Sequence, residues 1–435
     1  MSLILRGRLL SFLREPQDIT DTESFLYIED GGLLLQDGQI TMIGDFADVF
    51  DNAPPDATVT DHRPHLIMPG FIDTHLHFPQ MQVVGSYAGS LLEWLNTYTF
   101  IEEQRFADPE HAARIATKFF DELIRHGTTT AVAYCSVHKA SADAFFAESL
   151  RRDMCMIAGK VMMDRNAPEA LTDTPQSGYD ETRAVIEAWH GKGRNHVAIT
   201  PRFAITSSPE QMEMAQALAR EFPDLHIQTH LSENHAEIEF TRQLYPAAKD
   251  YTDVYAHYGL LGPKSLFGHC IHLSDREADA LSESGSVAVF CPTSNLFLGS
   301  GLFGLKRLSR RQKSVRVAVA TDIGGGTSYS MLRTLDEGYK VLQLQGERMT
   351  PFESFYRMTL GNAEALGLSD RIGTLEVGTD ADLVVLNSSS TPAMALKMEV
   401  ANSLAEELFL MQTMGDDRTI AETYVAGKPV KSGLV

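Results

Sequence analysis

Apolar runs alternate with amphipathic stretches through the middle of this chain. Eight strand-like runs lie between about residue 66 and residue 322, and helical stretches separate them. Strands that alternate with helices are typical of βα units around a parallel sheet. Eight such units predict an α/β protein with a (β/α)8 TIM-type barrel, whose active site lies at the C-terminal strand ends. The expected strands are 66–75, 128–135, 154–163, 197–207, 226–230, 265–269, 286–290 and 315–322.

Helix boundaries between these runs carry recognisable capping signals. Asp108 followed by Pro109 predicts the start of one helix, and Gly127 its end. Ser208-Pro209 predicts a second start, and the Ser-x-x-Glu pattern of residues 274–277 is a capping box.

The two ends of the chain have a different, β-rich pattern. Residues 1 to about 65 predict short strands, with Asp37-Gly38 as a hairpin turn, and contain no convincing helix. After about residue 370, β character returns and helical periodicity is again absent. We expect the ends to pair into one small β-domain, divided into 1–66 and 370–435, beside a barrel of 67–369.

Composition indicates a cytoplasmic globular protein and is compatible with a neutral small-molecule substrate. The chain has 435 residues, of which 43% are hydrophobic, enough for a large core. Its formal charge of −21 argues against nucleic acid or an anionic membrane as a partner. No apolar run reaches the roughly 18 residues of a membrane span, and Arg6 and Arg8 interrupt any secretory signal. The four scattered cysteines are interpreted as reduced core residues.

Two histidines at the end of the first barrel strand are candidate metal ligands. His75 and His77 are two residues apart, so they share one face of a strand. An arbitrary His-x-His pair is more often a surface feature, but this pair ends a buried apolar strand. His230 and Asp322 stand at the ends of the fifth and eighth strands. Together these four would give three imidazoles and one carboxylate around a metal, with a position left for water.

Further acid/base groups stand beside these candidate ligands. A bound metal would lower the pKa of its water from about 15.7 toward 7. Glu233 stands three residues after His230, close enough to accept and pass on the proton that this water releases. His269 is preferred to His272 because it directly follows the sixth strand, whereas His226 is interpreted as a core residue. The glycines at 324–326 predict a tight turn, because they lack the spacing of a phosphate loop.

Several motifs resemble those of the amidohydrolase superfamily and, within it, the guanine deaminase family. The resemblance covers essentially the whole chain. The motifs are Pro-Gly-Phe-Ile-Asp-Thr-His-Leu-His-Phe-Pro-Gln at 69–80, Pro-Arg-Phe at 201–203, Thr-His-Leu-Ser-Glu at 229–233, Gly-His at 268–269, Pro-Thr-Ser-Asn at 292–295 and Thr-Asp at 321–322.

This resemblance implies one zinc ion per chain, or Fe²⁺ in its place, and a homodimer. The implied metal ligands are His75, His77, His230 and Asp322. The implied catalytic residues are Glu233 as proton shuttle, and His269 with Asp322 positioning the attacking water. The implied purine-binding residues are Gln80, Arg202 and Phe203. A second metal would need a bridging lysine, and the fourth strand ends without one; Lys160 on the third strand is poorly placed for that role.

The implied activity is hydrolytic deamination of guanine to xanthine and ammonia. The planar fork of Arg202 suits the O6 and N7 acceptors of a purine. A second hypothesis is a related deaminase or dechlorinase acting on a pterin, an adenine derivative or a triazine. A third, disfavoured because all the ligands and Glu233 are present, is a non-catalytic scaffold. Segments 78–106 and 235–262 are candidate lids, with 90–95 as candidate pocket lining.

Overall fold

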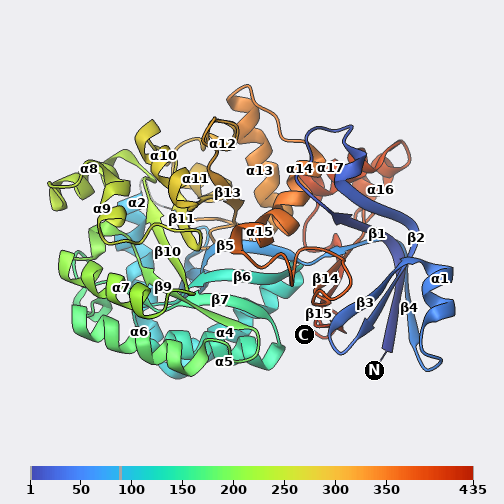
Figure 1. Ribbon diagram of the computed structural model, residues 1–435, viewed down its shortest axis with the longest axis horizontal. Helices are drawn as coiled ribbons and strands as arrows, with labels where there is room; N and C mark the ends of the chain where they lie inside the picture. The colour runs from blue at the N-terminus through green and yellow to red at the C-terminus, as the bar shows by residue number, and fades with distance from the viewer. Residues whose placement is uncertain (1, 88–90, 435) are drawn as a thin grey trace. The chain divides into compact units, whose positions relative to one another are not determined.

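The computed structural model describes residues 2–87 and 91–434, and in this part of the chain eight strands form a nearly closed barrel (Figure 1). The strands from β7 to β13 pair in parallel, as the alternation of strands and helices predicts. Each of the eight expected runs therefore contributes one of these eight barrel strands. They are β5 (Phe71–His77), β6 (Thr128–Tyr134), β7 (Cys155–Gly159), β9 (Asn195–Pro201), β10 (His226–Leu231), β11 (Ser265–His269), β12 (Val287–Phe290) and β13 (Arg316–Val319), with the short β8 (Val161–Met162) beside β9.

Burial explains why strands such as β7 and β12 appear as continuous apolar runs. Every residue of β5, β6 and β10 is buried, as is usual for parallel strands covered on both faces. Backbone hydrogen bonds join β5 to the segment after β13: the Asp322 N–H donates to the His75 carbonyl at 2.9 Å, and the His77 N–H donates to the Ile323 carbonyl at 2.9 Å. These bonds bring the first and last strand ends together.

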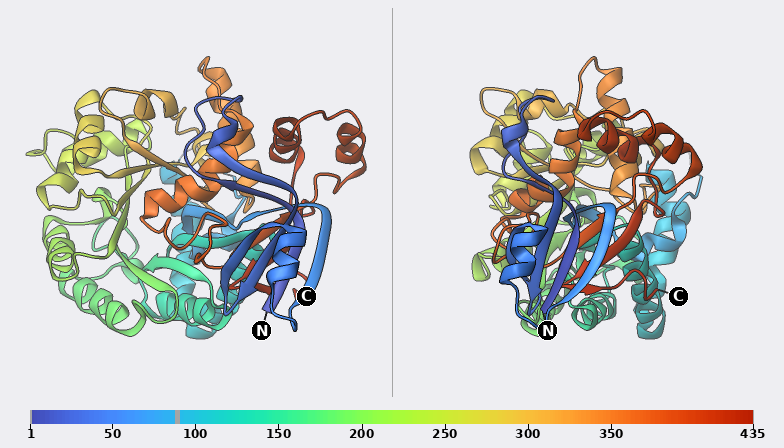
Figure 2. Two further views of the ribbon diagram at one scale, coloured as in Figure 1. Left: turned by 45° about the vertical axis from the view of Figure 1, so that its right-hand side comes forward. Right: turned by 90° about the vertical axis from the view of Figure 1, so that its right-hand side faces the viewer.

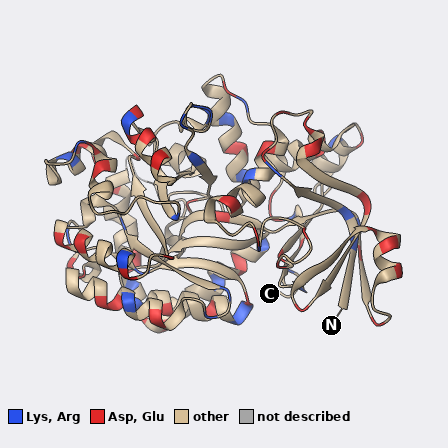
Figure 3. Ribbon diagram, viewed as in Figure 1, with Lys and Arg blue, Asp and Glu red and all other residues tan. Residues whose placement is uncertain are grey.

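Helices cover the outside of the strands, as α5, α6 and α7 show in Figures 1 and 2. The capping signals are confirmed: the Ser208 side chain accepts from the Gln211 N–H, and Ser274 forms a capping box with Glu277. Acidic and basic residues are interspersed on the outer helices (Figure 3). The helices are α4 (Pro109–Arg125), α5 (Lys139–Arg152), α6 (Pro175–Trp189), α7 (Pro209–Glu221), α8 (His235–Leu244), α9 (Tyr251–His257), α10 (Asp275–Ser284), α11 (Pro292–Phe297) and α12 (Leu305–Ser309).

The two ends of the chain form a separate sheet, which confirms that they pair (Figure 2). Asp37 and Gly38 both have positive φ, 49° and 83°, and connect β2 to β3 as the predicted two-residue hairpin. The strand order is β16-β15-β14-β4-β1-β2-β3. The strands are β1 (Ser2–Phe12), β2 (Phe25–Gln36), β3 (Gln39–Asp45), β4 (Thr58–Pro69), β14 (Leu383–Leu386), β15 (Ile420–Val425) and β16 (Lys428–Pro429).

The expected single strand 66–75 is wrong, because the chain changes sheets within it. β4 ends at Pro69 in the terminal sheet, and β5 begins at Phe71 in the barrel. Proline has no N–H for a central ladder. The connecting Gly70 is tightly packed, since a Cβ there would lie 2.2 Å from the Thr129 Oγ1. Only a residue without a side chain fits this crossing.

The expectation that both ends lack helices is also wrong. The structure contains α1 (Phe46–Asn52), α16 (Pro392–Met398) and α17 (Leu404–Met414). In α17 the buried side chains include the adjacent Leu410 and Met411, so apolar residues do not form one narrow stripe. The Ser403 cap, which accepts from the Glu406 N–H, was the remaining local signal.

The chain divides into two compact units. One contains residues 74–120 and 131–328, and every predicted site residue lies in it. The other contains 1–73, 121–130 and 329–435, including α13 (Met331–Leu344), α14 (Pro351–Tyr356) and α15 (Asn362–Leu366). The domain boundaries at 67 and 370 stay a prediction. None of the described helices combines the length and apolar character needed to cross a membrane.

Candidate active site

Four predicted ligands converge at the C-terminal ends of three barrel strands. His75 and His77 come from β5, His230 from β10, and Asp322 from the segment that follows β13. The Asp322 Oδ1 lies 3.3 Å from the His75 Nε2 and 3.4 Å from the His77 Nε2. The His77 Nε2 and His230 Nε2 are 3.1 Å apart. His75, His77 and Asp322 form one of the clusters whose ligand atoms could hold a metal ion.

The hydrogen bonds around this cluster fit a cation. The His230 Nδ1 lies 2.7 Å from the Arg202 carbonyl oxygen. That oxygen can only accept, so Nδ1 carries the proton and Nε2 keeps its lone pair for a metal. The Asp322 Oδ1 is buried and has no hydrogen-bond donor among the described residues. A buried carboxylate oxygen surrounded by imidazole nitrogens suits a divalent transition metal.

Electrostatics favour the protonation states that bind metal. Burial, followed by the neighbouring imidazoles, lowers the pKa of His77 and of His230 well below the ordinary value. Burial also lowers the pKa of His75. Burial opposes ionisation of Asp322, but His75 and the other histidines outweigh it and bring its pKa to about 2. Neutral imidazoles and an ionised carboxylate are the metal-binding forms.

Left-handed backbone conformations concentrate at the same strand ends. Ser232, His269 and Asp322 have φ values of 52°, 73° and 52°. Such values are uncommon for residues other than glycine and cluster at functional sites. They turn the chain sharply at the strand ends that carry Glu233, His269 and Asp322.

Glu233 and His269 form a second, adjoining group. The Ser300 hydroxyl donates to the Glu233 Oε1 at 2.8 Å, and the Glu233 Oε2 lies 3.4 Å from the His269 Nε2. The His269 Nδ1 is 2.9 Å from the Asn295 Oδ1, while its Nε2 is 3.8 Å from the Asp322 Oδ2. These contacts hold an acid/base pair directly beside the ligand cluster.

The surroundings of this pair favour proton transfer. Burial raises the pKa of Glu233 above its ordinary value. Burial acts to lower the pKa of His269, but the carboxylates of Glu233 and Asp322 outweigh it and raise that pKa. A carboxyl group whose pKa is raised toward neutrality can both accept and release a proton.

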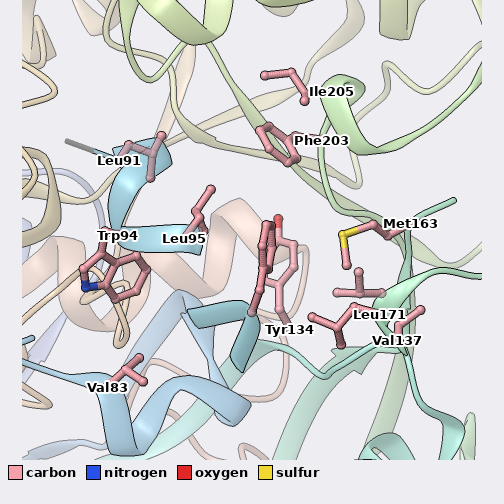
Figure 4. Packing of buried hydrophobic residues seen from close by; sticks show 12 residues of the cluster. Val83, Leu91, Trp94, Leu95, Tyr134, Val137, Met163, Leu171, Phe203 and Ile205 are labelled. Atoms are coloured by element: carbon pink, nitrogen blue, oxygen red, sulfur yellow. The ribbon is translucent and has the colours of Figure 1, made fainter. Parts of the chain in front are cut away.

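A cavity opens onto both groups. Gln80 and Arg202 line it together with Phe203, so the three predicted substrate-binding residues share one space with the ligand cluster. Figure 4 shows Leu91, Trp94, Leu95 and Phe203 around the same region. An apolar cavity with a few converging polar groups is typical of a small-molecule site.

The segment after β5 supplies part of this wall. Leu91 and Trp94 belong to α2 (Leu91–Trp94), and Leu95 follows it, which confirms these positions as pocket lining; Ser90 lies outside the described residues. None of residues 235–262, all of which are described, lines this cavity. The role of either segment as a lid stays a prediction.

Sequence reasoning missed three side chains that contact the predicted site residues. Glu103, in α3 (Phe100–Glu103), accepts from Gln80 and pairs with Arg202. Ser300 and Asn295 hold Glu233 and His269. Asn295 belongs to a motif that carried the family resemblance, but Ser300 and Glu103 follow no pattern in the sequence.

His226 and Lys160, which were not assigned to the site, do not line this cavity. His226 is buried, as expected of a core residue, and the Lys160 Nζ lies 2.8 Å from the Asp173 Oδ2. Residues 323–326 form a tight turn closed by an isolated bridge between Ile323 and Gly326. The predicted turn at the glycines is therefore confirmed.

Comparison with known families agrees with this geometry. The chain matches the amidohydrolase family over residues 66–430, which is most of its length. The chain therefore belongs to the amidohydrolase family, and it is a hydrolase of the kind that acts on C–N bonds.

Individual relatives narrow the comparison to guanine deaminases. The chain is 49% identical to the guanine deaminase of Escherichia coli (strain K12) over 98% of this chain and 97% of that protein. A solved structure of E. coli guanine deaminase has a TM-score of 0.94 and 47% identity, covering 99% of both chains. A guanine deaminase from C. acetobutylicum, solved with bound guanine in the active site, has a TM-score of 0.88 and 29% identity, covering 99% of this chain and 100% of that one.

Proposed function

We propose that this protein catalyses the hydrolytic deamination of guanine to xanthine and ammonia. The observation that carries the proposal is one cavity that is lined by Glu233, by members of the ligand cluster, and by Gln80 and Arg202. Its support is the similarity, over nearly the whole chain, to guanine deaminases.

The proposed metal ligands are His75, His77, His230 and Asp322, and the proposed metal is zinc. Three imidazoles and a carboxylate also suit iron, so metal analysis decides between them. When bound, the ion would supply a hydroxide nucleophile at neutral pH and stabilise developing negative charge.

Glu233 is the proposed proton shuttle. Its carboxylate accepts a proton from the attacking water and delivers it to the ring nitrogen beside the carbon that bears the amine. A second proton, from the hydroxyl of the adduct, passes through Glu233 to the leaving nitrogen. The C–N bond then breaks, ammonia leaves, and the oxygen of water remains on the ring as the new carbonyl. The Ser300 hydroxyl holds the carboxylate at the cavity during these transfers.

His269 and the purine-binding residues orient the reactants. Asn295 fixes the imidazole of His269, whose Nε2 faces the carboxylates of Glu233 and Asp322 and can hold the attacking water between them. Arg202 donates to the acceptors of the purine, and Phe203 packs beside the ring. The four cysteines, all within the described residues, are buried and form no disulfide bond, which supports the proposed cytoplasmic location. The homodimer stays a prediction.

The test is ammonia release from purified protein with guanine, beside adenine, a pterin and an amino-triazine, with metal content measured on the same sample. We expect guanine-selective release at about one zinc per chain. Selective release of ammonia from another ring would support the second hypothesis, in which the substrate is a different N-heterocycle. Bound metal without turnover of any of the four substrates would refute the proposal.

A further inference from the structure

Glu103 joins Gln80 and Arg202, two of the polar side chains that line the cavity. Its Oε1 accepts from the Gln80 Nε2 at 2.8 Å, and its Oε2 lies 2.7 Å from the Arg202 Nη1. Glu103 and Arg202 are 1% and 3% exposed, so this contact is shielded from water. Glu103 itself does not line the cavity.

The carboxylate determines which end of the Gln80 amide is available to a ligand. An ionised carboxylate only accepts hydrogen bonds, so the amide must turn its NH₂ toward Glu103. The Gln80 Oε1 is then the atom left for a ligand, and it is buried without a hydrogen-bond partner among the described residues. The Gln80 Oε1 packs against Gly324: a Cβ on that glycine would lie only 1.9 Å from this oxygen. The glycine leaves room for this orientation.

Arg202 is fixed by the same carboxylate from the other side. One Nη is occupied by Glu103, and the guanidinium carbon lies 5.4 Å from the centre of the Phe100 ring. The guanidinium has five N–H donors and no acceptor, so its remaining groups can only donate to a ligand. Gln80 and Arg202 therefore present one acceptor and one set of donors.

We propose that Glu103 is a specificity-determining residue, which makes Gln80 an obligate acceptor and so requires an N–H group on the substrate. The proposal rests on the proposed function, because it names the pattern read by the same cavity. Guanine offers an N–H beside an acceptor on two edges: N1–H beside O6, and N9–H beside N3. Without Glu103 the amide of Gln80 can rotate, and a ring acceptor can take the place of the N–H.

The experiment replaces Glu103 by Gln and compares three ligands that keep the 2-amino group. They are guanine, 2,6-diaminopurine, which has an acceptor at N1 in place of the N1–H, and 7-methylguanine, which has an acceptor at N9 in place of the N9–H. Dissociation constants by calorimetry and kcat/KM by ammonia release are measured for each. Wild-type protein is expected to discriminate against one analogue, which identifies the edge that Gln80 contacts. Glu103→Gln is expected to lower that discrimination by about tenfold or more, since an unpaired buried polar group rejects a ligand strongly.

Two further variants separate specificity from folding. Glu102→Gln is the matched control, because Glu102 is on the same helix but contacts Arg105 at 2.9 Å and His111 at 3.3 Å; its discrimination should equal that of wild type. If Glu103→Gln does not fold, Glu103→Asp keeps the charge but is one methylene too short to hold both partners. It should show the same loss of discrimination.

The outcomes distinguish this inference from the proposed function. If both Glu103 variants keep the wild-type ratio of dissociation constants between guanine and its analogues, the role of Glu103 is overturned and the proposed reaction is not. Uniform loss of affinity for all three ligands would also overturn it, since that is the effect of a merely structural residue. Selective binding without ammonia release would refute the proposed reaction and leave the binding test valid. Binding of none of the three ligands by wild-type protein would overturn both.

Discussion

Gly268 provides a sharp test of whether His75 is held in a metal-binding position. It lies in β11, immediately before His269. A Cβ at this residue would lie 2.6 Å from the His75 Cε1 and 3.0 Å from its Nδ1. The backbone of Gly268 is not in the left-handed region, so Gly268→Ala adds a methyl group without main-chain strain.

The magnitude follows from the distance that the His75 ring must move. Carbon atoms in ordinary contact are about 3.5–4.0 Å apart, so the ring has to shift by about 1 Å. It has little room, because the Tyr134 and His230 rings have centroids 4.9 Å and 4.8 Å from its own. A displacement of this size in a ligand is expected to cost about 10- to 100-fold in metal affinity and about 100-fold in kcat/KM.

The assay is chelator competition for the metal, with ammonia release from guanine on the same samples. Gly262→Ala is the matched control, because its Cβ would meet only the Ser265 Oγ at 3.8 Å. We expect the control to match wild type and both variants to remain folded by circular dichroism. Metal affinity and kcat/KM within twofold of wild type in Gly268→Ala would refute the assignment of His75 as a constrained ligand.

Three other substitutions test separate parts of the site. Glu233→Gln should retain the metal but lower kcat by about 10²- to 10⁴-fold; surviving turnover would exclude this residue as the proton shuttle. Arg202→Lys should lower kcat/KM for guanine about 10- to 100-fold with unchanged metal content, because lysine lacks the planar fork, and unchanged kinetics would contradict the purine contact. Burial and the nearby Glu233 raise the pKa of Glu237 from 4.5 to about 7. Because this pKa is higher in the folded protein than in the unfolded chain, the protonated carboxyl group adds to the free energy of unfolding. This contribution is fully present below about pH 4.5 and is lost as the pH rises through 7. From pH 4.5 to 8, Glu237→Gln should therefore gain up to about 3 kcal/mol relative to wild type in urea unfolding, and a pH-independent difference would refute this.

The barrel was predictable because each strand is a local pattern. A buried parallel strand such as β12 is a continuous apolar run. Helices such as α6, α7 and α10 begin with their own side-chain caps. The change of sheets at Gly70 was not predictable in this way. The residues from 66 to 75 form one apolar run, and the break depends on the approach of Thr129, which is distant in sequence. In α17 the apolar residues face several sides, which removed the periodicity that identifies a helix.

The ligand cluster was predictable for a related reason. Parallel strands place all their C-terminal ends at one face, so a histidine or aspartate at a strand end is brought to the others by the fold itself. No such rule determines where the residues that hold the site side chains, Ser300 and Glu103, lie in the sequence. Ser300 reaches Glu233 across 67 positions of sequence, and Glu103 reaches Arg202 across 99. Neither position follows a strand or belongs to a spacing that a sequence pattern could contain.

The metal ligands and the substrate-binding side chain of Gln80 are held in different ways, so substitutions can affect one without the other. The metal-binding side chains are fixed by strand ends and by backbone hydrogen bonds such as that from Asp322 to His75. The orientation of Gln80, in contrast, depends on one carboxylate at the end of the four-residue helix α3. Substitution in the segment after β5 can therefore alter which hydrogen bonds the cavity accepts while the cluster stays intact. If Glu103 has the role proposed here, exchanging it should change the preferred ring before it changes the reaction.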